Sequence, residues 1–263
     1  MCGIAGYSVD ERSGIDRTLA AQALLAGIAE RGADAVGYAY RETGPVVVHK
    51  ERSGASAVLE AVAVPETASQ LLVHVRDYTK GHPTIAANNH PIRHGAVVGI
   101  HNGIIVNDDE LFERHGLVRA EPDMTVDSEA IFALVDARPR DSSALEELHG
   151  AMAAAWLDER EPEALQLARG IGRPLWIGRG REALFFASTR AALELVGRTL
   201  RIRLRLGEVP EGRLLTVVAG SVAHHTRFKP DRSYREENVL PAVRAPHEGA
   251  FCLERLAALA ALG

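Results

Sequence analysis

The sequence predicts an α+β fold in which antiparallel β-sheets carry helices on their outer faces. Many short apolar segments are bounded by Gly or Pro, as is typical of strands. These segments mostly follow one another through short turns and do not alternate with helices, which favours antiparallel sheets. The chain has 263 residues, 46% of them hydrophobic, which is sufficient for a large buried core.

The predicted elements follow one another in chain order. A helix is expected over residues 16–32, where Asp16 can cap the start and Gly32 the end, and a second helix over 127–137. Residues 144–159 predict a helix up to Gly150 and then a strand. The polar residues 229–250 predict an arm that precedes a short helix at 251–262. Strands are predicted at residues 3–9, 37–40, 46–50, 71–75, 96–105, 165–169, 174–178, 183–188 and in a hairpin over 213–228 that turns at Ala219 and Gly220.

Composition excludes several classes of protein. The formal net charge of -5 and the pI near 6.1 argue against nucleic-acid binding. Two cysteines form neither a disulfide framework nor a zinc motif, and we interpret four neighbouring histidines as structural residues. The N-terminus does not resemble a signal peptide, and the apolar runs are shorter than the ~18 residues of a membrane span. We therefore expect a soluble, cytoplasmic protein without metal, cofactor or membrane contact.

Cys2 directly follows the initiator methionine in the opening segment "MCGIAGYSVD". Cysteine is small enough for Met1 to be removed before it, which would leave a thiol and a free α-amino group on one residue. These two groups can serve as nucleophile and general base. A second-position cysteine that merely begins a strand is the commoner case, so other residues must decide between the two interpretations.

Three other segments place polar residues beside apolar strands. Arg76 ends a strand, and its guanidinium could bind a carboxylate through two hydrogen bonds, although a surface arginine is commoner at such a position. Asn102 and Gly103 interrupt an apolar run, which indicates either a hairpin turn or an oxyanion hole. Asp127 begins a predicted helix, where it could cap the helix or bind a substrate ammonium group.

Taken together, the ordered segments resemble the class II glutamine amidotransferases, which are N-terminal-nucleophile hydrolases. The segments are "CGIAG", "RGADAVG", "HVRDYTKG", "NNHPI", "HNGIIVN" and "DSEAIFALV". In these motifs the chain is most similar to the glutaminase half of glucosamine-6-phosphate synthase, and the resemblance continues to about Phe228. It implies a four-layer αββα sandwich of two antiparallel sheets. It also implies a glutaminase domain over residues 1–228, followed by a C-terminal arm and short helix over 229–263.

The resemblance also implies roles for individual residues in catalysis. Cys2 would be the nucleophile with its own α-amine as the base, and Asn102 and Gly103 would form the oxyanion hole. Attack on the amide of glutamine would then give a γ-glutamyl thioester and ammonia, and water would release glutamate.

Substrate-binding roles follow in the same way. Arg76 would hold the α-carboxylate of glutamine, Asp127 its α-amino group, and Thr79 would lie in the same substrate loop. Arg31 matches the arginine of the motif near the nucleophile. Glutamine is a zwitterion, so a pocket specific for it needs one cation and one anion at a fixed distance from the thiol.

Two residues of the substrate loop depart from the family pattern. Asp77 stands where a tryptophan is usual, and Lys80 where a histidine is usual. A carboxylate strongly prefers water or a charged partner to an apolar lid. We therefore expect the loop to stay open, or to be completed by a partner surface.

These observations predict a glutaminase that supplies ammonia to a separate synthase subunit, because the residues after 228 are too few for a synthase domain. One alternative is an amidase that acts on a γ-glutamyl small molecule, since the same pocket recognises only the glutamyl end. Another, of a different class, is a non-catalytic glutamine-binding or interaction subunit.

Overall fold

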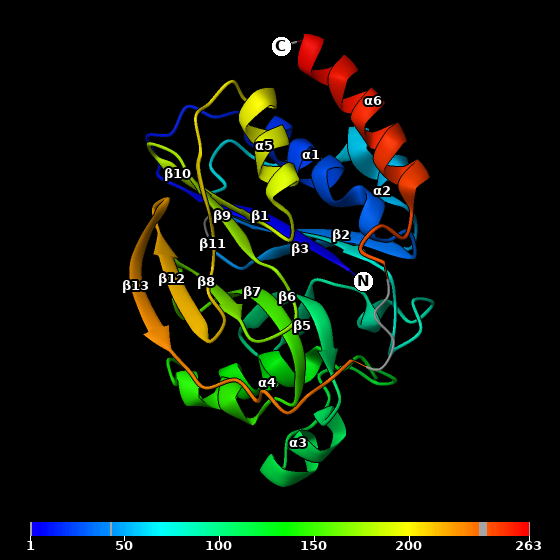
Figure 1. Cartoon of the computed structure of the whole chain (residues 1–263), viewed down its shortest axis with the longest axis vertical. Helices are drawn as coiled ribbons and strands as arrows, with labels where there is room; N and C mark the ends of the chain where they lie inside the picture. Colours follow the sequence, from blue (N-terminus) through cyan, green and yellow to red (C-terminus); the bar gives the residue numbers. More distant parts are fainter. Residues whose placement is uncertain (1, 43, 237–240, 263) are drawn as a thin grey trace.

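The computed structural model describes residues 2–42, 44–236 and 241–262. Two β-sheets lie face to face, and helices cover the outer face of each sheet (Figure 1). The pairings between neighbouring strands of these sheets are antiparallel. This arrangement confirms the four-layer αββα sandwich.

The first sheet has seven strands and contains the N-terminal strand near its centre. Its spatial order is β11 (Arg205–Glu208), β9 (Trp176–Arg179), β10 (Ala183–Ala187), β1 (Gly3–Val9), β4 (Gln70–Arg76), β2 (Ala35–Arg41) and β3 (Val47–Glu51). The second sheet has six strands, in the order β13 (Ser221–Arg227), β12 (Arg213–Val218), β8 (Ala164–Arg169), β7 (Gly150–Asp158), β6 (Val97–Ile105) and β5 (Ile92–His94).

Helices form the two outer layers. The first sheet is covered by α1 (Arg17–Ile28), α2 (Ala55–Val58), α5 (Arg190–Thr199) and α6 (Pro246–Leu262), and the second by α3 (Asp108–His115) and α4 (Glu129–Ala137) (Figure 1). Short 3₁₀ turns lie at η1 (Ala29–Arg31), η2 (Leu59–Ala61), η3 (Ala86–Asn88) and η4 (Ser142–Glu147). Within the described residues, no helix is both long and apolar enough to cross a membrane.

The alternation of side chains explains why a central strand such as β7 is apolar on both faces. In β7, Met152 and Trp156 pack toward α4, while Ala153 and Leu157 pack toward the first sheet. A strand that is buried on both faces has no position for a solvated side chain, so its sequence is continuously apolar. The result is three apolar layers, one between the sheets and one beneath each layer of helices.

Several details differ from the sequence predictions. Asp16 caps α1 as expected, accepting from the amide of Leu19 at 2.8 Å. Residues 142–147 form a 3₁₀ turn and not an α-helix before the strand. The C-terminal helix begins at Pro246, before the predicted start, because proline is favoured in the first turn of a helix. Its Cys252 and Leu256 are buried in the core that α1 also lines.

Candidate active site

Cys2 lies at the start of the central strand β1, level with the end of β4. Gly3 pairs with Val75 in the antiparallel register, which brings Cys2 opposite Arg76. The thiol donates to the backbone carbonyl of Asp77 at 3.5 Å, and the Arg31 Nε donates to the carbonyl of Cys2 at 2.9 Å. Arg31 is only 3% exposed, so this contact fixes the backbone of Cys2 from inside the protein.

The surroundings of the Cys2 thiol contain groups that raise its pKa and groups that lower it. Burial raises the pKa of Cys2 above its ordinary value, while the Asp77 backbone and the charge of Arg76 lower that pKa. A positive side chain beside a thiol is the arrangement that stabilises a thiolate. Burial therefore disfavours the Cys2 thiolate, and the nearby Arg76 cation offsets part of that cost.

Arg76 is almost completely buried and its guanidinium organises the loop that follows it. It donates to the Asn89 side-chain oxygen at 2.7 Å, to the Lys80 carbonyl at 2.9 Å, and to the carbonyls of Gly81 and Asn88. Burial lowers the pKa of Arg76, and the charges of Cys2 and Asp127 act in the opposite direction. Arg76 is thus a buried cation that interacts with both of these residues.

Asn102 lies on β6, in the sheet that faces β1 and β4. The His74 Nε2 donates to the backbone carbonyl of His101 at 3.2 Å, which ties β4 to β6 directly beside Asn102. Asn102 is fully buried, yet neither its side-chain oxygen nor its side-chain nitrogen has a hydrogen-bond partner among the described residues. A buried amide without a partner is costly, and such groups are a feature of functional sites.

Gly103 has a backbone conformation that requires glycine. Its φ is +154°, and a Cβ at this position would lie 1.9 Å from the carbonyl oxygen of Ala151. Gly103 is not the turn of a hairpin, because β6 continues through it and pairs with β7 up to Ile105. The hairpin interpretation of the Asn-Gly pair is therefore wrong.

Asp127 precedes α4 and does not cap it, since α4 begins at Glu129 after Ser128. Its carboxylate accepts from the backbone amide of Ile105 at 2.7 Å and is 3% exposed. Burial raises the pKa of Asp127 to about 6; the nearby Asp108 also raises this pKa, whereas Lys80 lowers it. The capping interpretation fails, and Asp127 is a buried carboxyl group whose pKa burial raises.

The structure thus brings together most of the predicted site residues. Contacts or charge interactions connect Cys2 with Arg31 and Arg76, and Arg76 with Asp127. Thr79 lies in the loop after Arg76 with its side chain exposed to solvent.

Both unusual charges of this loop have partners within the chain. Asp77 accepts from the Arg244 Nε at 3.1 Å, and Lys80 donates to Asp108 at 2.7 Å and to Asp109 at 2.9 Å. The loop is therefore held on two sides by residues of the same chain.

Sequence reasoning assigned no role to Asn88, although it lies in the "NNHPI" segment. Its side-chain oxygen accepts from the amides of Thr125 and Val126 at 2.8 and 3.0 Å, and its backbone carbonyl accepts from Arg76. Asn88 thereby connects Arg76 to the segment that leads into Asp127. A buried asparagine in a polar segment was the only signal, and it does not specify these partners.

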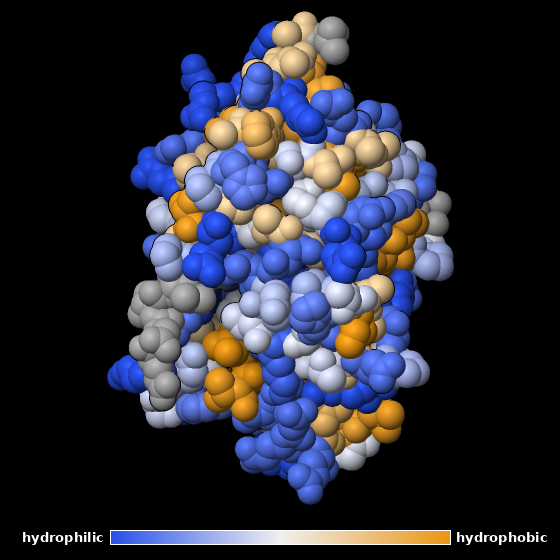
Figure 2. All heavy atoms as spheres, turned by 90° about the vertical axis from the view of Figure 1, so that its right-hand side faces the viewer, coloured by the Kyte–Doolittle hydropathy of each residue, from blue (hydrophilic) through white to orange (hydrophobic). Residues whose placement is uncertain are grey.

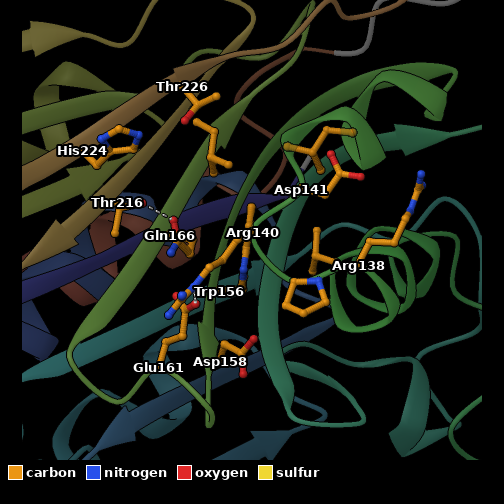
Figure 3. A pocket seen from close by; sticks show the side chains of 14 residues that line it. Arg138, Arg140, Asp141, Trp156, Asp158, Glu161, Gln166, Thr216, His224 and Thr226 are labelled. Atoms are coloured by element: carbon orange, nitrogen blue, oxygen red, sulfur yellow. Dashed lines mark hydrogen bonds and ion pairs between the residues drawn. The ribbon is translucent and has the colours of Figure 1, made fainter.

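A cavity of about 390 Å³ lies elsewhere, on the outer face of the second sheet beside α4 (Figure 3). Its charged side chains pair locally, for example Arg140 with Glu161, and Gln166 bonds to Thr216 at 2.9 Å. None of the predicted site residues lines this cavity, so it is separate from the candidate active site. Among the described residues, no group of three or more His, Cys, Asp or Glu side chains is arranged to hold a metal ion.

Comparison with known proteins places this geometry in a family. Residues 74–195 match the model of a glutamine amidotransferase domain. The glutamine–fructose-6-phosphate aminotransferase of Pseudomonas putida is 36% identical over 211 residues, which cover 74% of this chain and 33% of that protein. The enzyme of the same name from Aliivibrio fischeri is 33% identical over 229 residues, which cover 80% of this chain and 35% of that protein.

Solved structures support the same fold. The glutamine phosphoribosylpyrophosphate amidotransferase of Bacillus subtilis superposes with a TM-score of 0.69 and 21% identity, covering 88% of this chain and 50% of that one. A glutamine aminotransferase class-II domain protein from Silicibacter pomeroyi has a TM-score of 0.55 and 18% identity, covering 87% of this chain and 100% of that one.

The chain spans about a third of the length of the curated relatives that it matches. The chain therefore belongs to the class II glutamine amidotransferases, a family of enzymes with the N-terminal-nucleophile fold.

Proposed function

We propose that this chain hydrolyses the side-chain amide of L-glutamine and supplies the ammonia to a synthase on another chain. Cys2 is the nucleophile in this proposal. Its α-amine is the base once Met1, which lies outside the described residues, has been removed. Ammonia transfer of the kind that the full-length relatives carry out is part of this proposal, because this chain matches only about a third of their length.

Glutamine fits the charges around the thiol. Arg76 is a buried cation and Asp127 a buried carboxyl group, and both lie within charge-interaction range of each other. A zwitterionic amino acid satisfies both, because its carboxylate pairs with the guanidinium and its ammonium with the carboxylate. To bind the substrate carboxylate, Arg76 would exchange its bonds to the Lys80 and Gly81 carbonyls for bonds to glutamine.

The proposed reaction has two stages, formation of a γ-glutamyl thioester on Cys2 and its hydrolysis by water. The Cys2 sulfur attacks the amide carbon of glutamine while its proton passes to the α-amine, and a tetrahedral oxyanion forms. The carbon–nitrogen bond then breaks, the proton leaves with ammonia, and a γ-glutamyl thioester remains. Water attacks this thioester, which releases glutamate and restores the thiol.

The observation that carries the proposal is the unpartnered amide of Asn102 beside Gly103. An oxyanion hole needs donors that are fixed in place before the charge develops and that are not already bonded to the protein. A buried side-chain N–H without a partner meets that requirement. The adjacent amide of Gly103 is held by a backbone conformation that only glycine adopts readily.

The test measures glutamate and ammonia released from L-glutamine by the purified protein. Equal amounts of the two products are expected, and incubation with a diazoketone analogue of glutamine should add one label to the peptide that begins with Cys2. Cys2→Ala should abolish both results. The matched control is Cys252→Ala, which removes the other thiol, in α6, and should keep the activity.

Parallel assays with γ-glutamyl amides define the substrate class. Faster turnover of such a conjugate than of glutamine would replace the first proposal by the amidase function. Release of no product from either substrate by a folded protein that begins at Cys2, together with no labelling of Cys2, would refute the catalytic role altogether.

A further inference from the structure

The C-terminal segment returns to the candidate active site after leaving the second sheet. After β13, residues up to 236 pass along the α4 side of the molecule, and residues 241–245 lead into α6 above the first sheet (Figure 1). On the way, Glu236 pairs with both guanidinium nitrogens of Arg173 at 2.9 and 2.7 Å. Figure 2 shows the side of the molecule that this segment crosses, which is mainly hydrophilic.

The backbone of this segment is fixed next to the 3₁₀ turn η1. The amides of Arg244 and Ala245 both donate to the carbonyl of Glu30 at 2.9 Å. The next residue of that turn, Arg31, bonds to the carbonyl of Cys2. The position of Arg244 is thus set by the element that also holds the nucleophile.

The side chain of Arg244 completes a ring of contacts around the thiol. Its Nε donates to the Asp77 carboxylate at 3.1 Å, and the Asp77 carbonyl accepts from the Cys2 thiol at 3.5 Å. Arg31 and Glu30 close the ring on the other side. The pair joins residues that are 167 positions apart, so it connects the C-terminal segment to the loop after β4.

We propose that Arg244 is a positioning residue for the Cys2 site, acting through Asp77. It holds the loop so that the Asp77 carbonyl keeps the thiol in its reactive orientation, which makes the C-terminal segment part of the catalytic apparatus. This inference rests on the proposed function, because it assigns Arg244 to the same reaction.

The location of the pair argues for positioning over stability. The side chains of Arg244 and Asp77 are 37% and 16% exposed. An exposed or partly exposed ion pair contributes only ~0–1 kcal/mol to folding. A displacement of about 1 Å in an active site can nevertheless cost ~10²-fold in rate. The neighbours of Asp77 are already tied, since Asp34 bonds to the carbonyl of Arg76 and to the amide of Tyr78. Asp34 thus holds the backbone on either side of Asp77, and Arg244 holds the Asp77 side chain.

The experiment compares Arg244→Gln, Arg244→Lys, Asp77→Asn and the double variant Arg244→Gln/Asp77→Asn in the full chain. We expect Arg244→Gln to lower kcat by about five- to tenfold, because a partial displacement of the thiol loses part of the ~10²-fold that a shift of about 1 Å can cost. KM and Tm should change little, because a partly exposed ion pair contributes only ~0–1 kcal/mol to folding. Arg244→Lys should recover part of kcat. The double variant should be no slower than the slower single variant, because both changes break one interaction.

The control is Arg255→Gln, which removes an equal charge from α6. Arg255 pairs with Glu60 at 3.6 Å and takes no part in the ring of contacts around the thiol. It should keep kcat. An equal loss in this control would assign the effect to docking of the helix and would overturn the proposal, as would additive effects in the double variant or an unchanged kcat in Arg244→Gln.

A second readout does not depend on glutamine turnover. The rate at which iodoacetamide alkylates Cys2, followed by peptide mass spectrometry, reports the orientation and access of the thiol. We expect a changed alkylation rate in Arg244→Gln and an unchanged rate in Arg255→Gln. If the wild-type protein fails to hydrolyse glutamine, the proposed function fails, while this comparison still supports or overturns the positioning role.

Discussion

Replacement of Asp127 by asparagine tests how the site binds the substrate ammonium group. The carboxylate is buried and accepts from the amide of Ile105, so a substrate ammonium would meet it in a water-poor setting. A charge-assisted hydrogen bond of this kind contributes roughly 1.5–3 kcal/mol, or about 10–100-fold in affinity. We expect glutamine affinity to fall by that factor in Asp127→Asn.

The raised pKa of Asp127 gives the same prediction a pH dependence. With a pKa of about 6, the group is largely neutral at pH 5 and must lose its proton to pair with ammonium. Because only about a tenth of the sites are ionised one pH unit below the pKa, the Kd for glutamine should rise about tenfold there. Burial holds the pKa values of the neighbouring His74 and His101 at about 3, so these groups do not titrate in this range.

The assay is calorimetric titration of glutamine into Cys2→Ala, which binds without turnover, between pH 5 and pH 8. The Asp127→Asn version should bind weakly and show a flat pH profile. Because the folded pKa of Asp127 is raised, its ionisation costs stability as pH rises from about 4 to about 6, where the unfolded chain has already lost the proton. The variant avoids this cost, so its Tm at neutral pH should be equal or higher. A lower Tm together with unchanged glutamine affinity would show that Asp127 is purely structural.

Three further changes address the rest of the site. Asn102→Ala should lower kcat by about 10²–10³-fold, as loss of an oxyanion donor does, while Tm stays constant because the amide has no partner among the described residues; a stability loss with normal kcat would contradict this. Gly103→Ala should reduce both stability, as followed by thermal unfolding, and activity, because its Cβ would lie 1.9 Å from the Ala151 oxygen. A variant as stable as the wild type would show that β6 can shift. Intact-mass measurement of the active protein should show that Met1 is missing, and equal activity with Met1 attached would exclude the α-amine as the base.

The fold could be predicted because its strands are short, apolar and separated by turn residues. The helices α3 and α5 were not predicted, although their signals are present. Asp108 and Asp109 open α3 and Gly116 ends it with a φ of +60°, and Thr189 caps α5. In α3 the apolar residues are only Leu111 and Phe112, so its helical period is difficult to distinguish from a loop. In α5 the buried Ala192, Leu193 and Val196 share one face, so that helix was predictable from its period.

The chemistry of the site could be predicted from motifs, but its connections could not. The ordered motifs indicate that Cys2, Arg76 and Asn102 belong to the site, although each residue taken alone also has an ordinary structural interpretation. The sequence cannot give the strand register that sets Cys2 opposite Arg76. A shift of one residue leaves the composition of the strand unchanged but turns every side chain to the other face of the sheet. Nor can the sequence give the contact between Asp77 and Arg244, which depends on the path of the C-terminal segment across the folded protein.

The central position of β1 determines how the protein should be produced for study. Its first residue, Gly3, is already paired with β4, so any peptide fused ahead of Cys2 would have to leave the protein through the region around the thiol and Arg31. The end of α6 lies at one end of the molecule, whereas the N-terminus lies near its middle (Figure 1). An affinity tag belongs after α6, whereas an N-terminal tag would block the amine and crowd the substrate loop even in a correctly folded preparation.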